Sequence, residues 1–146
     1  MNPCISLTIP AKAEYLHIVR LTLYGIATKA GFSFEEIEDM KVAVAEACNN
    51  AVLHAYQNET EGSVEVCFEL EEKALCIHIK DQGTSYDYEQ RVGKADSLHD
   101  KRLSEVNVGG LGIYLMQALM DKVQVRTDHG TEVILTKLLG RNEEWA

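Results

Sequence analysis

The sequence predicts an α+β fold, a two-layer sandwich in which a mixed, mostly antiparallel sheet of about five strands is covered on one face by three helices. Two observations lead to this prediction. Apolar residues alternate with polar ones in several short segments, as in strands with one buried face, and recur at spacings of three and four in longer segments, as on one face of a helix. These segments follow one another as strand, two helices, two strands, one helix and two strands, without the regular alternation of a parallel sheet.

The N-terminal part of the chain is predicted to form a strand and then a helix. The alternating segment 5–9 indicates a strand that stops at Pro10. Apolar residues recur at helical spacing over 11–30, and Gly31 follows as a typical helix stop. We therefore expect a first amphipathic helix between Pro10 and Gly31.

The second helix has the clearest start signal in the chain. Ser33 and Glu36 form an S-x-x-E capping box, and further acidic residues surround the positive end of the helix dipole. Apolar residues then line one face to about Tyr56. Because this helix is rich in alanine, we expect a sheet or another helix to approach it closely.

The rest of the chain is predicted to contain two pairs of strands with a helix between them. The alternating segments 64–70 and 75–80 indicate an antiparallel hairpin. A helix is expected from the glycine-rich segment to about Asp121, followed by strands at 123–127 and 132–138.

Between 88 and 108 no periodicity is sustained, and a segment of this kind within a compact domain is typical of a functional lid. The last residues, 141–146, form a short polar tail. With 146 residues, the chain is expected to be a single domain, 1–146, with a flexible lid at about 88–108.

Charge and hydropathy argue against two classes of partner. The formal net charge of −9 repels nucleic acid, and no basic stripe interleaved with aromatic residues is present, so direct binding of nucleic acid is not expected. No apolar run approaches the roughly 18 residues that a membrane-spanning helix requires. The sequence therefore predicts a cytoplasmic protein that does not bind a membrane.

The four cysteines show no metal-binding or redox motif. None belongs to a C-x-x-C pair or has a histidine at zinc-finger spacing. We expect Cys4, Cys48, Cys67 and Cys76 to be reduced and to pack as small hydrophobic residues. In the alternative interpretation, Cys67 and Cys76 face each other across the hairpin and form a redox switch.

The first candidate site motif lies on the second helix. Glu46 and Asn50 are four residues apart and project from the same side of that helix. An amide oxygen suits the coordination of Mg²⁺, and a neighbouring carboxylate suits the orientation or deprotonation of a nucleophile. The ordinary alternative is a solvated helix face.

Two further motifs lie at a strand end and a helix start. Asp81 follows a strand, where a carboxylate can accept a hydrogen bond from an exocyclic amine, and Gly83 lets a flat base approach the backbone. Gly109, Gly110 and Gly112 open a helix, where free N–H groups bind anions. The alternatives are a simple turn and a plain glycine-rich connector.

Taken in order, the three motifs resemble the N, G1 and G2 boxes of the GHKL ATPases. The segments 46–56, 81–87 and 109–116 are more specifically similar to the anti-sigma serine kinases of spore-forming and related bacteria. The helical segment 13–24 extends the resemblance, which covers nearly the whole chain.

This resemblance implies a Bergerat-type ATP-binding fold that uses Mg²⁺ and ATP. In such a site Asn50 holds the metal, Glu46 is the catalytic base, and Asp81 selects adenine with the help of the Thr131 hydroxyl. The glycine-rich helix start binds the phosphates. The implied partners are an anti-sigma factor antagonist of the STAS fold, phosphorylated on serine, a sigma factor of the sigma-B type, and a second copy of the chain in a homodimer.

Two other functions compete with a serine kinase. In the first alternative, the chain is an ATP-binding anti-sigma module without kinase turnover. Such a module would not need the base at Glu46. In the second it is the catalytic domain of a histidine kinase, but no dimerisation segment with a phospho-accepting histidine precedes it in this sequence.

Overall fold

The computed structural model describes residues 2–57, 62–81, 110–127 and 130–140. The expected lid at 88–108, the tail at 141–146, and Gly83 and Gly109 of the two glycine motifs lie outside these residues.

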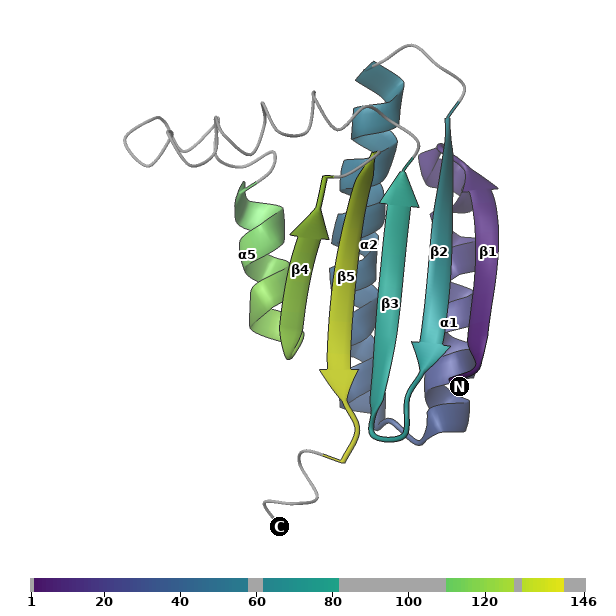
Figure 1. Cartoon of the computed structure of the whole chain (residues 1–146), viewed down its shortest axis with the longest axis vertical. Coiled ribbons are helices and arrows are strands. Elements are labelled where there is room, and N and C mark those ends of the chain that lie inside the picture. Colours follow the sequence, from purple (N-terminus) through teal and green to yellow (C-terminus); the bar gives the residue numbers. More distant parts are fainter. Residues whose placement is uncertain (1, 58–61, 82–109, 128–129, 141–146) are drawn as a thin grey trace.

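The described strands form one sheet in the order β1-β2-β3-β5-β4 (Figure 1). Their bounds are Cys4–Pro10 (β1), Ser63–Leu70 (β2), Ala74–Asp81 (β3), Lys122–Arg126 (β4) and Thr131–Leu138 (β5). Every pairing between these strands is antiparallel, where the sequence predicted a mixed, mostly antiparallel sheet.

The described helices, α1 (Leu16–Ala30), α2 (Phe34–Gln57) and α5 (Gly110–Leu119), all lie on one face of the sheet (Figure 1). This arrangement confirms the predicted two-layer α+β sandwich. The first helix starts later than expected, after a 3₁₀ turn at Ala13–Tyr15. The reason is that the Ala11 N–H donates to the Gly62 carbonyl at 2.9 Å and so extends the β1–β2 pairing.

Local signals in the sequence set the junction between α1 and α2. Gly31 has a φ of 100°, the left-handed conformation that ends a helix and favours glycine. The Ser33 N–H donates to Glu36 Oε1 at 2.8 Å, and the Glu36 N–H donates to Ser33 Oγ at 3.1 Å. The predicted capping box is therefore confirmed, and it fixes the start of the helix that carries Glu46 and Asn50.

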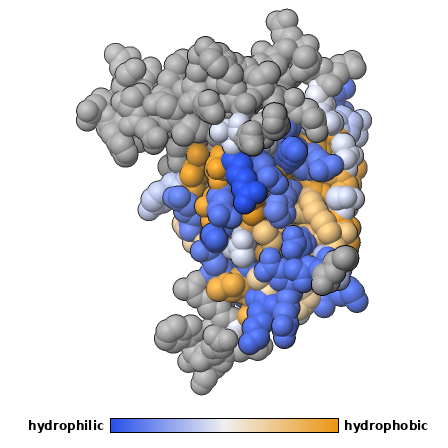
Figure 2. All heavy atoms as spheres, in the orientation of Figure 1, coloured by the Kyte–Doolittle hydropathy of each residue, from blue (hydrophilic) through white to orange (hydrophobic). Residues whose placement is uncertain are grey.

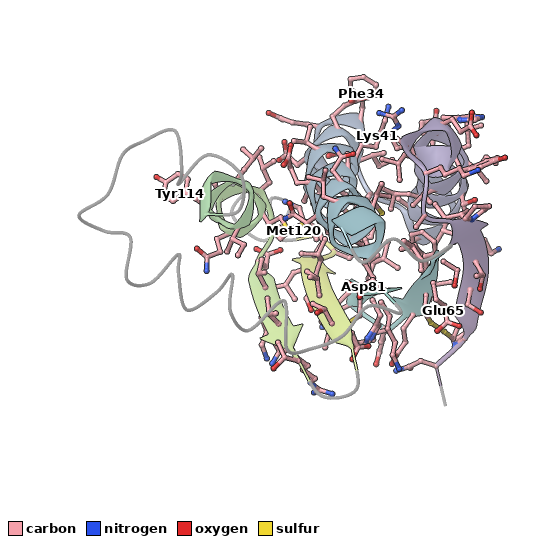
Figure 3. All side chains as sticks on the ribbon, turned by 90° about the horizontal axis from the view of Figure 1, so that it is seen from above. Phe34, Lys41, Glu65, Asp81, Tyr114 and Met120 are labelled. Carbon is pink, nitrogen blue, oxygen red and sulfur yellow. A yellow bond between two sulfur atoms is a disulfide. The ribbon has the colours of Figure 1, made fainter. Side chains whose placement is uncertain are left out.

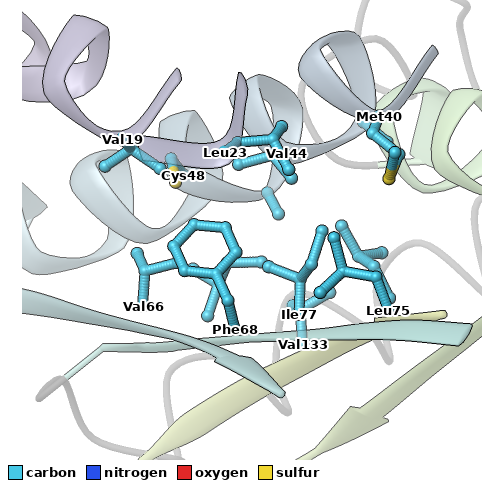
Figure 4. Close-up of a cluster of buried hydrophobic side chains, with 14 of the residues drawn as sticks. Val19, Leu23, Met40, Val44, Cys48, Val66, Phe68, Leu75, Ile77 and Val133 are labelled. Atoms are coloured by element: carbon cyan, nitrogen blue, oxygen red, sulfur yellow. The ribbon is translucent and has the colours of Figure 1, made fainter. Parts of the chain in front are cut away.

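The core lies between the helices and the inner face of the sheet (Figure 4). The helices contribute fully buried side chains that include Leu23, Met40 and Val44, and the sheet contributes Phe68 and Ile77. Burying such side chains is worth about 1.5–3 kcal/mol each, so this contact holds α2 firmly above the strands. None of the helices in the described part of the chain is long and apolar enough to cross a membrane.

The cysteines differ from the expectation that all four are reduced. Cys4 and Cys67 form a disulfide that joins β1 to β2, with their Cα atoms 6.5 Å apart. Only Cys48 and Cys76 are free thiols. The alternative interpretation, in which Cys67 and Cys76 face each other across the hairpin, was also wrong. The cross-strand partner of Cys67 in β3 is His78. Periodicity shows which face a residue occupies, but the register depends on how the strands pair.

Candidate functional site

Helix α2 has one face that packs in the core and a neighbouring face that carries the polar candidate site residues. Val44, Ala47 and Cys48 are buried against the sheet and α1. Glu46 and Asn50 are half-buried and lie one turn apart on a neighbouring strip of the same helix. Their position at the border of the core restricts both side chains without removing them from solvent.

The first turn of α5 lies directly against this polar strip. A Cβ atom built on Gly112 would lie 3.2 Å from Glu46 Oε2 and 3.5 Å from Asn50 Nδ2. The absence of a side chain at Gly112 therefore leaves the room that the carboxylate and the amide occupy. The structure thus brings together three of the predicted site residues, from two helices that are far apart in the sequence.

Asp81 and Thr131 form a second pair, at the adjoining ends of β3 and β5. They are direct cross-strand partners, and each is only 2% exposed. Within the described residues the buried Thr131 hydroxyl has no hydrogen-bond partner. A buried polar group without a partner costs about 1–3 kcal/mol, so this hydroxyl is well suited to a ligand that supplies the missing bond.

The two pairs lie at the same end of the molecule (Figure 1). The C-terminal half of α2, the end of β3, and the starts of β5 and α5 meet at this end. Seen from above, Asp81 lies between the sheet and α2, whereas Tyr114 points away from the other helices (Figure 3). The buried pair Asp81 and Thr131 and the start of α5 therefore belong to one region of the molecule.

The start of α5 has the electrostatics of an anion site. Helix α5 begins at Gly110, and its first turn contains no acidic residue. Its N–H groups are the positive end of the helix dipole, which favours phosphate. Among the described residues no group of three or more His, Cys, Asp or Glu side chains is arranged to hold a metal ion. Asn50 offers an amide oxygen at this end, and Mg²⁺ bound together with a nucleotide takes some of its ligands from the phosphates.

The sequence did not predict the polar cluster on the outer face of the sheet. His78, Cys76 and Glu132 lie in contact on β3 and β5. The alternation along the strand already placed Cys76 and His78 on the outer face of the sheet. Their contact with Glu132 depends on how β3 pairs with its neighbouring strands, which no local pattern shows.

Comparison with known proteins identifies the family. The family model described as "Histidine kinase-like ATPase domain" matches residues 9–137 of the chain. This match covers all the described strands and helices except residues 4–8 of β1 and the last residue of β5.

Relatives similar over nearly the whole chain carry the name serine-protein kinase RsbW. The protein of Bacillus licheniformis is 46% identical over 138 residues, which cover 94% of this chain and 86% of that protein. The protein of Bacillus subtilis strain 168 is 42% identical, covering 92% and 85% respectively. The protein of Listeria monocytogenes EGD-e is 41% identical over 146 residues, covering 98% and 92%.

A solved structure supports the fold. The crystal structure of the RsbU and RsbW domains of Rv1364c from Mycobacterium tuberculosis matches with a TM-score of 0.65 at 21% identity. The match covers 93% of this chain and 32% of that longer one. By sequence and by fold, the chain belongs to the histidine kinase-like ATPase domain family, together with the serine-protein kinases named RsbW.

Proposed function

We propose that the chain is a cytoplasmic serine-protein kinase that transfers the γ-phosphoryl group of ATP to an anti-sigma factor antagonist of the STAS fold. As an anti-sigma factor it also binds and inhibits a sigma factor of the sigma-B type. Membership of an ATPase family and the serine-protein kinase names of its relatives support this proposal. The observation that carries it is the Glu46 carboxylate at the phosphate-binding start of α5.

Nucleotide selection is assigned to the buried pair between β3 and β5. The Asp81 carboxylate accepts a hydrogen bond from the exocyclic amine of adenine and would be repelled by the carbonyl of guanine. The Thr131 hydroxyl, which lacks a partner among the described residues, supplies a second polar contact to the base. Gly83 is proposed to let the base approach the backbone beyond Asp81.

Phosphates and magnesium are assigned to the facing helices. The N–H groups of the segment from Gly109 to Gly112 bind the phosphates, and Asn50 holds Mg²⁺ by its amide oxygen. When bound there, the ion would neutralise negative charge on the phosphates during transfer. The segment 88–108 is proposed as a lid over the nucleotide, in a chain that forms one domain.

Glu46 is proposed as the base that acts on the acceptor serine. Its Oε2 atom lies next to Gly112, so the carboxylate is beside the phosphates rather than beside the base pocket at Asp81. Half-buried on α2, it is restricted in movement and reachable by a partner's hydroxyl group. It orients that hydroxyl toward the γ-phosphoryl group and takes its proton.

Partner binding is assigned to the outer side of α1, at the edge of the molecule next to β1. Ile18, Leu21 and Tyr24 are 39%, 68% and 49% exposed on this helix. Exposed apolar side chains that lie close together on one helix are typical of an interaction surface. We assign the contact between the two copies of the homodimer to this side of the chain. The net charge of −9 suits a sigma factor that presents a basic face.

The direct test is a transfer assay. The purified protein is mixed with radiolabelled ATP, magnesium, a candidate STAS-fold antagonist and a candidate sigma factor. Label on a serine of the antagonist, together with co-purification of the sigma factor, supports the proposal. If the protein binds ATP and the sigma factor but labels no antagonist, the ATP-binding anti-sigma module without turnover is the correct function.

Replacing Asp81 with Asn should weaken ATP binding. The amide oxygen can still accept from the amino group of adenine but carries no charge, and a hydrogen bond to a charged group is worth about 1.5–3 kcal/mol, so we expect a loss of roughly tenfold in affinity. Discrimination against GTP should also fall, because the new amide can donate to a carbonyl. Calorimetry with both nucleotides measures the two effects, and equal affinity of the wild-type protein for ATP and GTP would contradict the assignment.

Replacing Gly112 with Ala should reduce phosphoryl transfer while preserving the fold. The new Cβ, 3.2 Å from Glu46 Oε2, moves the carboxylate by a few tenths of an ångström. Since misplacement by about 1 Å can cost 10²-fold, we expect a loss of roughly tenfold in rate. The free energy of unfolding should not decrease, because alanine favours a helix by about 1 kcal/mol over glycine.

The matched control for that helix effect is Gly25→Ala on α1, where nothing lies within 4 Å of the added Cβ. Both variants should match or exceed the wild-type free energy of unfolding in urea. A Gly112→Ala protein with the wild-type transfer rate would show that the position of Glu46 does not limit the reaction.

A further inference from the structure

A lysine lies on the face of β5 that points toward the helices. Side chains two positions apart share one face of a strand, so Lys137 follows Val133 and Leu135, which are buried in the core. Its direct cross-strand partner is Leu75, which is fully buried. Charged side chains ordinarily point to solvent, as on the outer face in Figure 2, where hydrophilic side chains gather over the middle of the sheet. Only 13% of the Lys137 side chain is exposed, so its ammonium group needs partners inside the molecule.

The ammonium group of Lys137 caps the C-terminal end of α5. Its Nζ atom donates to the carbonyl oxygen of Leu119, the last residue of that helix, at 2.7 Å. The last carbonyl groups of a helix have no partner within it, and a cation there interacts favourably with the negative end of the dipole. The last turn of α5 contains no basic residue of its own. Lys137 therefore supplies from β5 the charge that this helix end lacks.

Other contacts join the same end of α5 to its neighbours. Lys137 Nζ lies 3.9 Å from Asp39 Oδ2 on α2. Just beyond the helix, the Asp121 N–H donates to the Thr136 carbonyl at 2.9 Å, and the Leu138 N–H donates to Asp121 Oδ2 at 2.7 Å. The C-terminal end of α5 is thus bound to β5 directly and to α2 through the ammonium group.

The contacts between α5 and α2 have the same spacing on both helices, which run antiparallel (Figure 1). Gly112, near the start of α5, lies next to Glu46. Leu119 is seven residues further along α5, and Asp39 is seven residues back along α2. Seven residues are about two helical turns, so Asp39 and Glu46 lie on the same side of α2. The helix pair therefore has two fixed points, one at the candidate site and one at Lys137.

We propose that Lys137 is a positioning residue for the nucleotide site at the other end of α5. By holding the C-terminal end of the helix to β5 and α2, it sets where the first turn of α5 lies relative to Glu46 and Asn50. A helix of ten residues spans about 15 Å, and α5 contains no proline, so a shift at one end is carried to the other. This inference rests on the proposed function, because the group that it positions is the phosphate-binding helix start.

A role of this kind concerns the phosphates and not the base. The phosphates are assigned to α5 and α2, whereas the base is assigned to Asp81 and Thr131 on β3 and β5. A change at Lys137 that displaces α5 should therefore weaken the binding of ADP and leave the binding of adenosine unchanged. A general loss of stability would instead weaken the binding of both ligands in the same proportion.

The test compares Lys137→Met with the wild-type protein. Methionine keeps an apolar stem of similar length but removes the charge and the donor to Leu119. We expect the affinity for ADP, measured by calorimetry, to fall about tenfold, because misplacement by about 1 Å can cost 10²-fold and the helix remains packed on the core. The affinity for adenosine, measured by ligand-observed NMR, should keep its wild-type value. Equal losses for both ligands, or no loss for either, would overturn the proposal.

Lys137→Arg and Lys122→Met are the matched variants. Arginine retains the charge and several donors, so it should recover most of the affinity for ADP. Lys122 is exposed on the outer face of the sheet, three residues beyond Leu119, so Lys122→Met removes the same charge near the same helix end without altering the cap. It should bind ADP as the wild-type protein does. A loss in Lys122→Met as large as in Lys137→Met would show that net charge, and not the cap, is responsible.

The wild-type protein separates a failure of this inference from a failure of the proposed function. If the wild-type protein binds neither ATP nor ADP, the nucleotide site itself is rejected, and this inference with it. If the wild-type protein binds ADP and Lys137→Met binds it equally well, only the role of Lys137 is rejected. Unfolding in urea shows whether Lys137→Met is folded. If it is not, Lys137→Gln, which keeps a polar group of shorter reach, is measured in its place with the same expected results.

Discussion

The Glu46→Gln protein is expected to bind ATP and the sigma factor as the wild-type protein does, and to phosphorylate the antagonist about 10²–10⁴-fold more slowly. The amide fills the same volume as the carboxylate beside Gly112, so the contact between α2 and α5 stays unchanged. What is lost is the base that takes the proton of the attacking serine. Single-turnover transfer from radiolabelled ATP measures the rate, and calorimetry measures the binding of nucleotide.

A second glutamate on the same helix is the control. Glu38 lies on α2 and forms a partly exposed i,i+3 ion pair with Lys41 at 3.3 Å, a contact worth little to stability. Glu38→Gln removes the same charge from the same helix but far from Gly112, and should phosphorylate the antagonist at the wild-type rate. If Glu46→Gln does so too, Glu46 is not the base. If ATP binding is lost as well, Glu46 belongs to the nucleotide site instead.

Most of the fold could be predicted because its signals are local. The capping box of Ser33 and Glu36 and the left-handed Gly31 each depend on a few neighbouring residues, and both were confirmed. The alternation in β2 and β3 shows directly which side chains face the core. The order of elements then leaves few arrangements other than a sheet with helices on one face.

The register of the strands could not be predicted, and it carries the details of the site. Asp81 and Thr131 were assigned to one nucleotide only through a family resemblance, whereas the ladder makes them direct neighbours. The closeness of Gly112 to Glu46 depends on how α5 packs against α2, to which no local pattern refers. The candidate residues could therefore be predicted from the sequence, whereas the contacts among them depend on strand register and helix packing.

The state of the cysteines also depends on strand register, and here the expectation from the sequence was wrong. The expectation of four reduced thiols followed from the absence of known motifs, but the β1–β2 register brings Cys4 to Cys67.

The Asn50→Ala protein is expected to lose most of its affinity for magnesium–ATP. In the proposed site Asn50 supplies the amide oxygen that holds the ion, whereas the Glu46 carboxylate one turn away is assigned to the acceptor serine, so no other group on α2 is proposed as a ligand. Loss of even an outer-shell partner of a metal typically costs 10–100-fold, so we expect at least a loss on that order. The remaining binding of ATP should depend much less on magnesium than in the wild-type protein.

Asn49→Ala is the matched control, since Asn49 is the exposed neighbour of Asn50 on the same helix and points away from the half-buried strip. Calorimetric titration of ATP with magnesium and with a chelator separates the two contributions. In the wild-type protein and in Asn49→Ala, chelation should weaken binding strongly, whereas in Asn50→Ala it should have little further effect. An Asn50→Ala protein that binds magnesium–ATP as tightly as Asn49→Ala would remove the metal from this residue. The Mg²⁺ would then be held by the nucleotide phosphates and by groups outside α2.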